Sequence, residues 1–301
     1  MLDLQRILCP IDFSDASRRA LDHATVVARW YGSRLTAMHV VSPLFVPVPP
    51  VLFADAEGAK THLTEVETDD VAARVRTWLA PAVEAGLTAD VLIEEGNQPA
   101  SHIVGYAASW PADLIVLGTH GRSGFDHLLL GSVTEKVLRK APCPVMTVPP
   151  PVASASHLPY KRLLCPVDFS TSSLAALRFA MSMAKESDAN LTITYAVEWT
   201  AGELPVTGPF DYTEFRRQYE EDAQRRLDAL VSAEARAWCR PTTTLRHGRP
   251  YEEILALARE EDADLIVMGV HGRNVLDRIL FGSTTNHVVR RATCPVLTLS
   301  A

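Results

Sequence analysis

The sequence predicts an α/β protein made of two tandem doubly wound domains, each a five-stranded parallel sheet with helices on both faces. Apolar, strand-like runs alternate with amphipathic helical segments along the chain, and this alternation favours crossover connections between parallel strands. The same order of segments occurs twice, and 301 residues give room for two domains of about 150 residues. We therefore expect a first domain at 1–150, a proline-rich linker at 151–160 and a second domain at 161–301.

The first domain is expected to begin with a strand at 6–13. Ser14 then starts a helix that continues to about residue 31, because apolar residues recur there at helical spacing. A second strand at 34–41 leads into a proline-rich excursion, and a long helix with many surface charges follows at 63–85.

The rest of the first domain follows the same alternation. A strand at 87–94 precedes a helix at 99–110, which has Pro99 in its first turn. An apolar run at 113–117 predicts a buried strand, a helix is expected at 133–140, and a short strand at 143–148 ends the domain.

The second domain repeats this plan, which indicates a duplication. Asp12 and Asp168 occupy the same place in the two copies, and the differences in length fall in loops, where they are tolerated best. Strands are expected at 161–169, 190–197, 242–247, 264–268 and 295–299, and helices at 172–185, 212–237, 250–261 and 284–291.

Composition and charge exclude several classes of protein. The chain is 47% hydrophobic and 22% charged, with a net charge of −7, and neither half has the basic excess of a nucleic-acid binder. No apolar signal-peptide core follows the N-terminus, and the most apolar loop is too short to cross a bilayer. We expect a cytoplasmic protein without nucleic-acid or membrane partners, whose five cysteines are buried thiols in a reducing compartment.

A glycine motif occurs once in each half. The first copy is Leu117-Gly118-Thr119-His120-Gly121-Arg122, followed nine residues after Gly121 by Gly131-Ser132. The second copy is Met268-Gly269-Val270-His271-Gly272-Arg273, followed at the same spacing by Gly282-Ser283. Each copy links a buried strand to a helix. Glycines let a backbone approach a ligand closely and adopt positive φ, and a helix N-terminus attracts anions, so the motif favours phosphate binding.

A purely structural interpretation of the motif stays open. Both copies can be tight turns, with Ser132 and Ser283 as N-caps, and Ser132-Val133-Thr134-Glu135 even fits a capping box. Two copies with the same spacing make a chance match unattractive as an explanation.

The repeated G-x-x-G, nine residues, G-S pattern resembles the ATP-binding branch of the universal stress proteins, in a tandem two-domain form. This resemblance implies a strand order of 3-2-1-4-5 in each half and the binding of ATP, either alone or together with Mg²⁺. It also implies two sets of nucleotide-binding residues, each with a base and ribose part and a phosphate part. In the first half these are Ile11, Asp12, Val40, Leu117, Gly118, His120, Gly121, Arg122, Gly131, Ser132 and Val133. In the second half they are Val167, Asp168, Ala196, Met268, Gly269, His271, Gly272, Arg273, Gly282, Ser283 and Thr284.

Several of these residues have a structural alternative. Asp12 and Asp168 can cap backbone N–H groups at a strand end, or accept hydrogen bonds from the adenosine part of a nucleotide, as the resemblance favours. His120 and His271, and likewise Arg122 and Arg273, can contact phosphate or simply lie at a solvated turn. We interpret His39, beside the base region, as a packing residue.

The two copies also differ. Ala196 is smaller than Val40, so the second pocket is expected to hold the base less closely. Glu135 becomes Asn286, which removes a carboxylate that competes with phosphate for the positive end of a helix. The balance of these two effects stays open.

Two classes of function follow. The first is a nucleotide-binding stress-response or signalling protein whose contacts with a protein partner depend on its ligand. The second is an enzyme, a slow ATPase or nucleotidyl transferase. The sequence has no G-x-x-x-x-G-K-[ST] loop and no clear Mg²⁺ carboxylate beyond Asp12 and Asp168, which favours binding. Because the short terminal strands would form sheet edges, we expect them to pair as an intramolecular pseudo-dimer or between two chains of a homodimer.

Overall fold

The computed structural model of the chain describes residues 2–42, 44–45, 60–61, 65–119, 130–150, 160–198, 212–231, 236, 241–270 and 282–300. We call residues 1–150 the first half and residues 161–301 the second half. His120, Gly121 and Arg122, and their counterparts His271, Gly272 and Arg273, lie outside the described residues.

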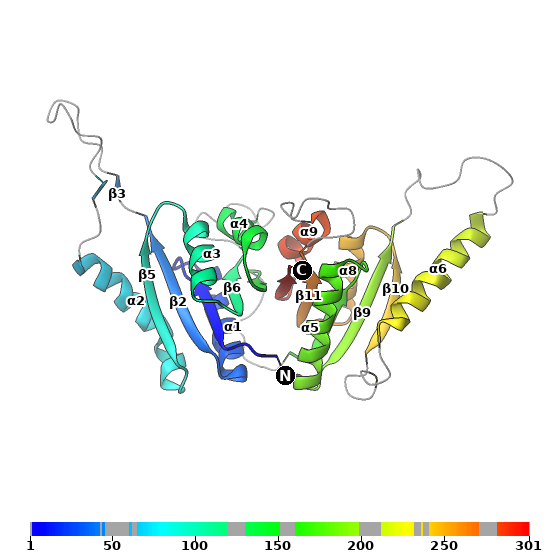
Figure 1. Cartoon of the computed structure of the whole chain (residues 1–301), viewed down its shortest axis with the longest axis horizontal. Helices are drawn as coiled ribbons and strands as arrows, with labels where there is room; N and C mark the ends of the chain where they lie inside the picture. The colour runs from blue at the N-terminus through cyan, green and yellow to red at the C-terminus, as the bar shows by residue number, and fades with distance from the viewer. Residues whose placement is uncertain are drawn as a thin grey trace, which may run out of the picture.

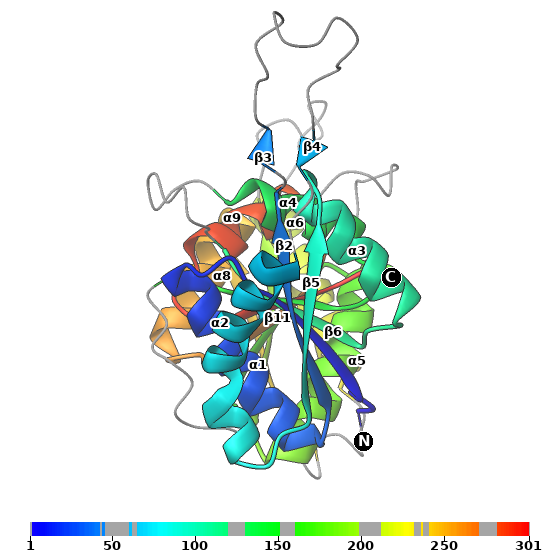
Figure 2. The ribbon, with the colours of Figure 1, turned by 90° about the vertical axis from the view of Figure 1, so that its left-hand side faces the viewer.

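The first half contains five strands of the main sheet and four helices in alternation. The strands are β1 (Arg6–Pro10), β2 (Arg34–Val41), β5 (Ala89–Glu95), β6 (Leu114–Gly118) and β7 (Val145–Val148). The helices are α1 (Asp15–Tyr31), α2 (Glu65–Glu84), α3 (Pro99–Ser109) and α4 (Ser132–Lys140). A hairpin of β3 (Leu44–Phe45) and β4 (Lys60–Thr61), which the sequence did not predict, extends beyond the sheet (Figure 2).

The second half repeats this arrangement. Its strands are β8 (Arg162–Pro166), β9 (Asn190–Val197), β10 (Thr242–His247), β11 (Leu265–Gly269) and β12 (Val296–Leu299). Its helices are α5 (Thr171–Ser187), α6 (Tyr212–Ala229), α8 (Pro250–Glu260) and α9 (Ser283–Arg291). The predicted elements are therefore present, but three predicted segments extended several residues too far. β1 ends at Pro10 and β8 at Pro166, before Phe13 and Phe169 with φ values of 63° and 64°, and α6 ends at Ala229.

All ten strands belong to one sheet, in the order β10-β9-β8-β11-β12-β7-β6-β1-β2-β5. Within each half the strands are parallel and follow the order 3-2-1-4-5, which confirms the predicted fold. The two halves lie side by side, with α2 and α6 at the outer ends (Figure 1). This order places the carboxyl ends of β1 and β6 next to each other, at the point where ligands bind in open α/β sheets.

The two halves join through their terminal strands, which pair antiparallel within the chain. Met146 of β7 lies opposite Leu297 of β12, and both side chains are fully buried. The hydroxyl of Thr147 donates to the carbonyl oxygen of Val296 at 3.2 Å, and that of Thr298 donates to Val145 at 3.1 Å. The predicted pairing is therefore intramolecular, and it leaves neither terminal strand as a sheet edge.

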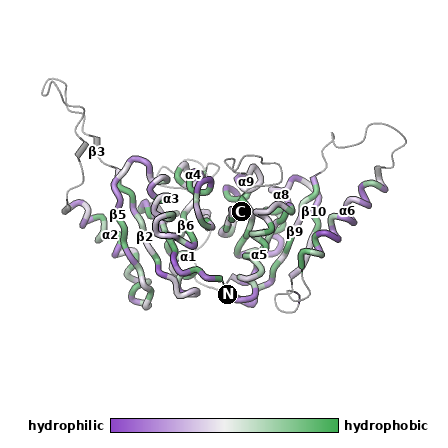
Figure 3. The backbone as a smooth tube through the Cα atoms, viewed as in Figure 1, coloured by the Kyte–Doolittle hydropathy of each residue, from purple (hydrophilic) through white to green (hydrophobic). Residues whose placement is uncertain are grey.

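Helices cover both faces of the sheet and form two apolar cores. One core lies between the sheet and α1, α2, α5 and α6, and the other lies under α3, α4, α8 and α9. Hydrophobic positions concentrate in the strands, whereas α6 carries long hydrophilic stretches (Figure 3). In the part of the chain that the structure describes, no helix has the length and apolarity needed to cross a membrane.

Candidate functional site

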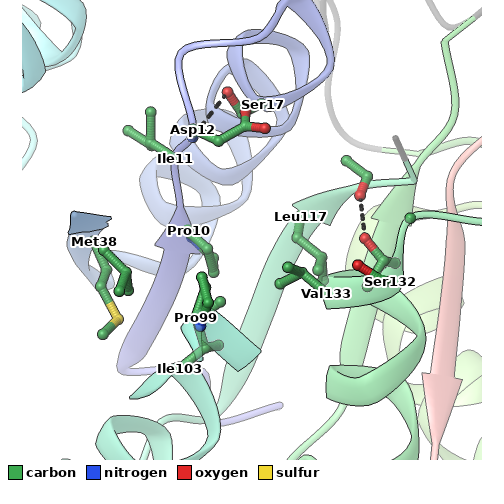
Figure 4. Close-up of a pocket in the computed structure, with 14 residues that line it drawn as sticks. Pro10, Ile11, Asp12, Ser17, Met38, Pro99, Ile103, Leu117, Ser132 and Val133 are labelled. Atoms are coloured by element: carbon green, nitrogen blue, oxygen red, sulfur yellow. Dashed lines mark hydrogen bonds between the residues drawn. The ribbon is translucent and has the colours of Figure 1, made fainter. Parts of the chain in front are cut away.

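A cavity of about 290 Å³ opens at the carboxyl ends of β1 and β6 (Figure 4). Its size is close to the lower end of the range of about 300–1,000 Å³ for small-molecule sites. Residues from β1, β2, α1, α3, β6 and α4 line it: Pro10, Ile11, Asp12, Ser17, Met38, Val40, Pro99, Ile103, Leu117, Gly118, Gly131, Ser132, Val133 and Thr134. Every predicted site residue of the first half that falls within the described residues is in this lining.

The turn from β1 into α1 forms the upper edge of the cavity in Figure 4. The carboxylate Oδ1 of Asp12 accepts hydrogen bonds from the backbone N–H of Ser14 at 3.0 Å and from its hydroxyl at 2.5 Å. Ser14 is the N-cap of α1, and its hydroxyl oxygen accepts from the N–H of Ser17 at 3.2 Å. The structural role that we considered for Asp12 is thus present, and the same carboxylate lies in the wall of the cavity.

Phe13, directly after Asp12, is held in an uncommon backbone conformation with a φ of 63°. Its ring packs against His39 with ring centroids 4.7 Å apart, and the guanidinium of Arg74 lies 4.0 Å from the ring centroid. The Nδ1 atom of His39 lies 2.6 Å from the carbonyl oxygen of Ile11. His39 is therefore a packing residue, as predicted, and it fixes the strand end that carries Ile11 and Asp12.

The end of β6 and the start of α4 form the opposite side of the cavity. The N–H of Gly131 donates to the carbonyl oxygen of Thr119 at 2.8 Å, and the hydroxyl of Thr134 donates to the carbonyl oxygen of Gly118 at 2.8 Å. Both bonds hold the N-terminus of α4 against the end of β6. Because the first amide groups of a helix have no intrahelical acceptor, this end of α4 offers N–H groups and a partial positive charge.

Two expectations about this turn were wrong. The N-cap of α4 is Gly131, not Ser132, and that of α9 is Gly282, not Ser283, so the serines are the first helical residues. Gly131 and Gly282 have φ values of −59° and −58°, so positive φ is not what glycine provides at these positions.

Close packing against α1 explains why position 118 is a glycine. A Cβ atom at this position would lie 2.9 Å from the backbone carbonyl carbon of Ala16 in α1. In the second half, a Cβ on Gly269 would lie 2.8 Å from the backbone carbon of Ser172. Glycine at both positions lets the end of β6 pass close to the first turn of α1, and the end of β11 close to that of α5.

One side of the cavity is apolar. Met38 and Val40 of β2, Pro99 and Ile103 of α3 and Leu117 of β6 form its walls. The sequence indicated Val40 and Leu117, but six other lining residues were missed: Pro10, Ser17, Met38, Pro99, Ile103 and Thr134. All of these except Met38 had a signal, because the equivalent residues of the repeat are identical: Pro166, Ser173, Pro250, Ile254 and Thr285.

The second half reproduces the polar framework. Asp168 Oδ1 accepts from the N–H and the hydroxyl of Ser170 at 3.0 and 2.5 Å, and Thr285 donates to the carbonyl oxygen of Gly269 at 2.9 Å. Phe169 has a φ of 64°, and the guanidinium of Arg226 lies 4.2 Å from its ring centroid. Val167 and Met268 are buried at the positions of Ile11 and Leu117. Ala196, Gly282, Ser283 and Thr284 hold the remaining equivalent positions on β9 and at the start of α9.

The described cysteines do not belong to the site. Cys9, Cys143, Cys165 and Cys294 are free and buried, as expected. Burial raises the pKa of all four thiols, to about 12 for Cys143 and Cys294, which also face the negative charges of Asp113 and Asp264. Such thiols stay protonated and poorly nucleophilic at neutral pH. Cys239 lies outside the described residues.

No group of three or more His, Cys, Asp or Glu side chains among the described residues is arranged to hold a metal ion. The described side chains do not fit a protein-built Mg²⁺ site, so no chemical step is assigned to Mg²⁺.

Comparison with known proteins agrees with the fold and covers both halves. The model of the universal stress protein family matches residues 3–149 and 159–300. A universal stress protein of Mycolicibacterium smegmatis is 27% identical over 305 residues, which covers 97% of this chain and 95% of that protein. One of Methanocaldococcus jannaschii is 35% identical over 147 residues, 49% of this chain and 83% of its own. The crystal structure of a universal stress protein from Archaeoglobus fulgidus aligns with a TM-score of 0.67 and 24% identity over 99% of both chains, a likeness of fold.

Proposed function

The chain belongs to the universal stress protein family, and from this premise we propose that it binds ATP in each half and acts through contacts with a protein partner that depend on nucleotide occupancy. One observation carries the proposal. The cavity joins an apolar wall of Met38, Val40 and Leu117 to the N-terminus of α4 at Gly131 and Ser132.

These two ends match the two ends of a nucleotide. An adenine ring buries a flat, weakly polar surface, which suits the wall formed by Val40, Leu117 and their neighbours. A phosphate group suits the start of α4, where unpaired N–H groups and the helix dipole favour negative charge. Asp12 belongs to the same lining, where a carboxylate can accept hydrogen bonds from ribose hydroxyls.

The local charge also supports phosphate at this end. Glu135, the acidic residue of the first turn of α4, forms an ion pair with Arg139 at 3.4 Å, so its charge is partly balanced within the helix. In α9 the equivalent residue is Asn286, and no acidic residue stands in the first turn.

The test uses one filling substitution per half. Val40→Trp places an indole in the first cavity, and Ala196→Trp places one at the equivalent position on β9; both residues are only partly buried. We expect calorimetry with ATP to show two sites in the wild type, one in each single variant and none in the double variant. Circular dichroism and thermal unfolding check that each variant is folded. ATP binding by the folded double variant with wild-type affinity would refute the proposal.

A further inference from the structure

Thr194 of β9 carries a buried hydroxyl that nothing in the described structure satisfies. The residue is 1% exposed, and its Oγ1 atom has no hydrogen-bond partner. Buried hydroxyls are almost always paired, because an unpaired one loses its bonds to water without replacement. An exception in a native fold therefore calls for an explanation, and a bound ligand is one.

The strand register places Thr194 at the position in the second half that Met38 occupies in the first half. Thr194 pairs with Pro166 of β8 in the same way that Met38 pairs with Pro10 of β1. The carbonyl oxygens also correspond, since Ile11 N–H donates to Met38 at 2.7 Å and Val167 N–H donates to Thr194 at 2.8 Å. Met38 lines the cavity of the first half, and its side chain borders that cavity in Figure 4.

Side chains alternate between the two faces of a strand, which fixes the direction of Thr194. Leu191 and Ile193 belong to the core under α5 and α6. Thr194 therefore faces the opposite side, the side of α8, on which Ile254 and Met268 lie in the second core. These two residues correspond to Ile103 and Leu117, which line the first cavity. Thr194 thus lies on the same face of its strand as Met38 does in the first half, among residues equivalent to those that line the first cavity.

The two halves also differ at a second position on the same strand face. Val40 lines the first cavity, whereas β9 has Ala196 at this position. The side chains that β9 provides, Thr194 and Ala196, are therefore smaller than Met38 and Val40 of β2, and Thr194 is also more polar. The opposite walls stay apolar in both halves. The two sites differ where a base would contact the second strand of each half.

We propose that the two halves differ in base preference: the first half prefers an adenine nucleotide, whereas the second half, which also binds ATP, binds a guanine nucleotide more tightly. This inference rests on the proposed nucleotide-binding function. Guanine is larger than adenine and carries both a keto oxygen and an amino group, so it suits a wider wall with a hydroxyl. Thr194 Oγ1 can donate to the keto oxygen or accept from the amino group. A site built around such a bond discriminates against ligands that leave it unpaired.

The experiment isolates the second half in the folded, full-length chain that carries Val40→Trp. Affinities for GTP and ATP are measured by calorimetry in this background, with and without Thr194→Val, which keeps the shape of the side chain but removes the hydroxyl. We expect GTP to bind more tightly than ATP, and Thr194→Val to weaken GTP by about tenfold, the value of one hydrogen bond, while ATP changes little.

Thr192→Val is the matched control. Thr192 lies on the same face of β9, but its hydroxyl is paired with that of Thr242 at 3.1 Å. Its loss should leave both affinities unchanged. The reciprocal test is Met38→Thr with Val40→Ala in a chain blocked by Ala196→Trp, where we expect the first half to gain affinity for GTP relative to ATP.

The outcomes separate the two proposals. If the second half binds ATP and GTP equally, or if Thr194→Val leaves GTP affinity unchanged, the base specificity is refuted while nucleotide binding stands. If Thr194→Val changes thermal stability alone, the hydroxyl pairs with an internal water and the inference again fails. If the second half binds neither nucleotide, the proposed function itself fails for that half.

Discussion

The hydroxyl of Thr134 donates a 2.8 Å hydrogen bond to the carbonyl oxygen of Gly118, and Thr285 makes the same bond to Gly269 at 2.9 Å. Each bond joins the first turn of a helix to the last residue of the neighbouring strand. Both threonines are buried, so the bonds are shielded from water. Through them, the strand end and the helix N-terminus that border the site keep a fixed distance.

We expect Thr134→Val to destabilise the fold by about 1–3 kcal/mol, because the variant leaves a buried carbonyl oxygen without this partner. ATP affinity of the first half should fall as well, since the start of α4 is no longer fixed to β6. Thr77→Val is the control: its hydroxyl bonds Ala73 on an exposed helix face, and its loss should cost less than about 0.5 kcal/mol. Urea unfolding measures both values, and equal losses would contradict the assignment.

Gly118→Ala should destabilise the protein by about 1–3 kcal/mol, because the added methyl meets the backbone of Ala16, which has little freedom to move. Gly105→Ala is a matched control within helix α3, where an added Cβ has no neighbour within 4 Å. There the change should stabilise by about 0.5–1 kcal/mol, because glycine is a poor helix residue. Thermal unfolding compares the two, and a tolerated Gly118→Ala would show that the close approach is not required.

The comparison of sequence and structure separates local from non-local information. The ranges of β2 and β9 were predicted without error, because both segments are rich in apolar and β-branched residues, which favour strands. The strand order came from a resemblance and not from periodicity, since hydrophobic patterns carry no information about which strands are neighbours. The end of β1 was misplaced because Phe13 looks like a strand residue, whereas the bond from Ser14 to Asp12 turns the chain there.

The residues of the site also separate into those that local sequence predicts and those that only the fold brings together. Residues of the glycine motif were predictable, because they are close in sequence and recur with fixed spacing. Met38 was not, because its counterpart in the repeat is Thr194 and only the pairing of β2 with β1 brings it to the cavity. Pro99 and Ile103 recur as Pro250 and Ile254, but only the fold shows that α3 reaches the cavity. Gly118 was predicted to bind phosphate; that a Cβ atom there would also meet the backbone of Ala16 was not foreseen, because such a close approach leaves no mark on a single sequence.

Alkaline pH should destabilise the protein through its buried thiols. The pKa values of Cys143 and Cys294 are raised to about 12, above the value of about 8.5 in an unfolded chain. Their contribution to stability is fully present below about pH 8.5 and is lost as the pH rises towards the folded pKa. Between these limits each thiol lowers the free energy of unfolding by about 1.4 kcal/mol per pH unit.

The measurement is urea unfolding at several pH values from 8 to 10. The variant Cys143→Ala with Cys294→Ala should start from a lower stability, because it loses buried side chains, but it should lose less stability with rising pH than the wild type. An unchanged slope would show that these thiols do not ionise on unfolding in this range.

Asp12→Asn separates the two roles that Asp12 can have. Asparagine keeps an oxygen that accepts from the N–H and the hydroxyl of Ser14, so the turn into α1 should persist and thermal stability should change little. A carboxylate that also accepts from a ribose hydroxyl forms a charge-assisted bond, roughly twice as strong as a neutral one. We therefore expect ATP affinity of the first half, measured by calorimetry with Ala196→Trp in the background, to fall about tenfold.

Asp12→Ala removes both roles and should lose stability as well as affinity, and Asp168→Asn should leave the first half unaffected. If Asp12→Asn binds ATP as tightly as the wild type, Asp12 only holds the turn, and the ribose contact must come from another residue of the cavity.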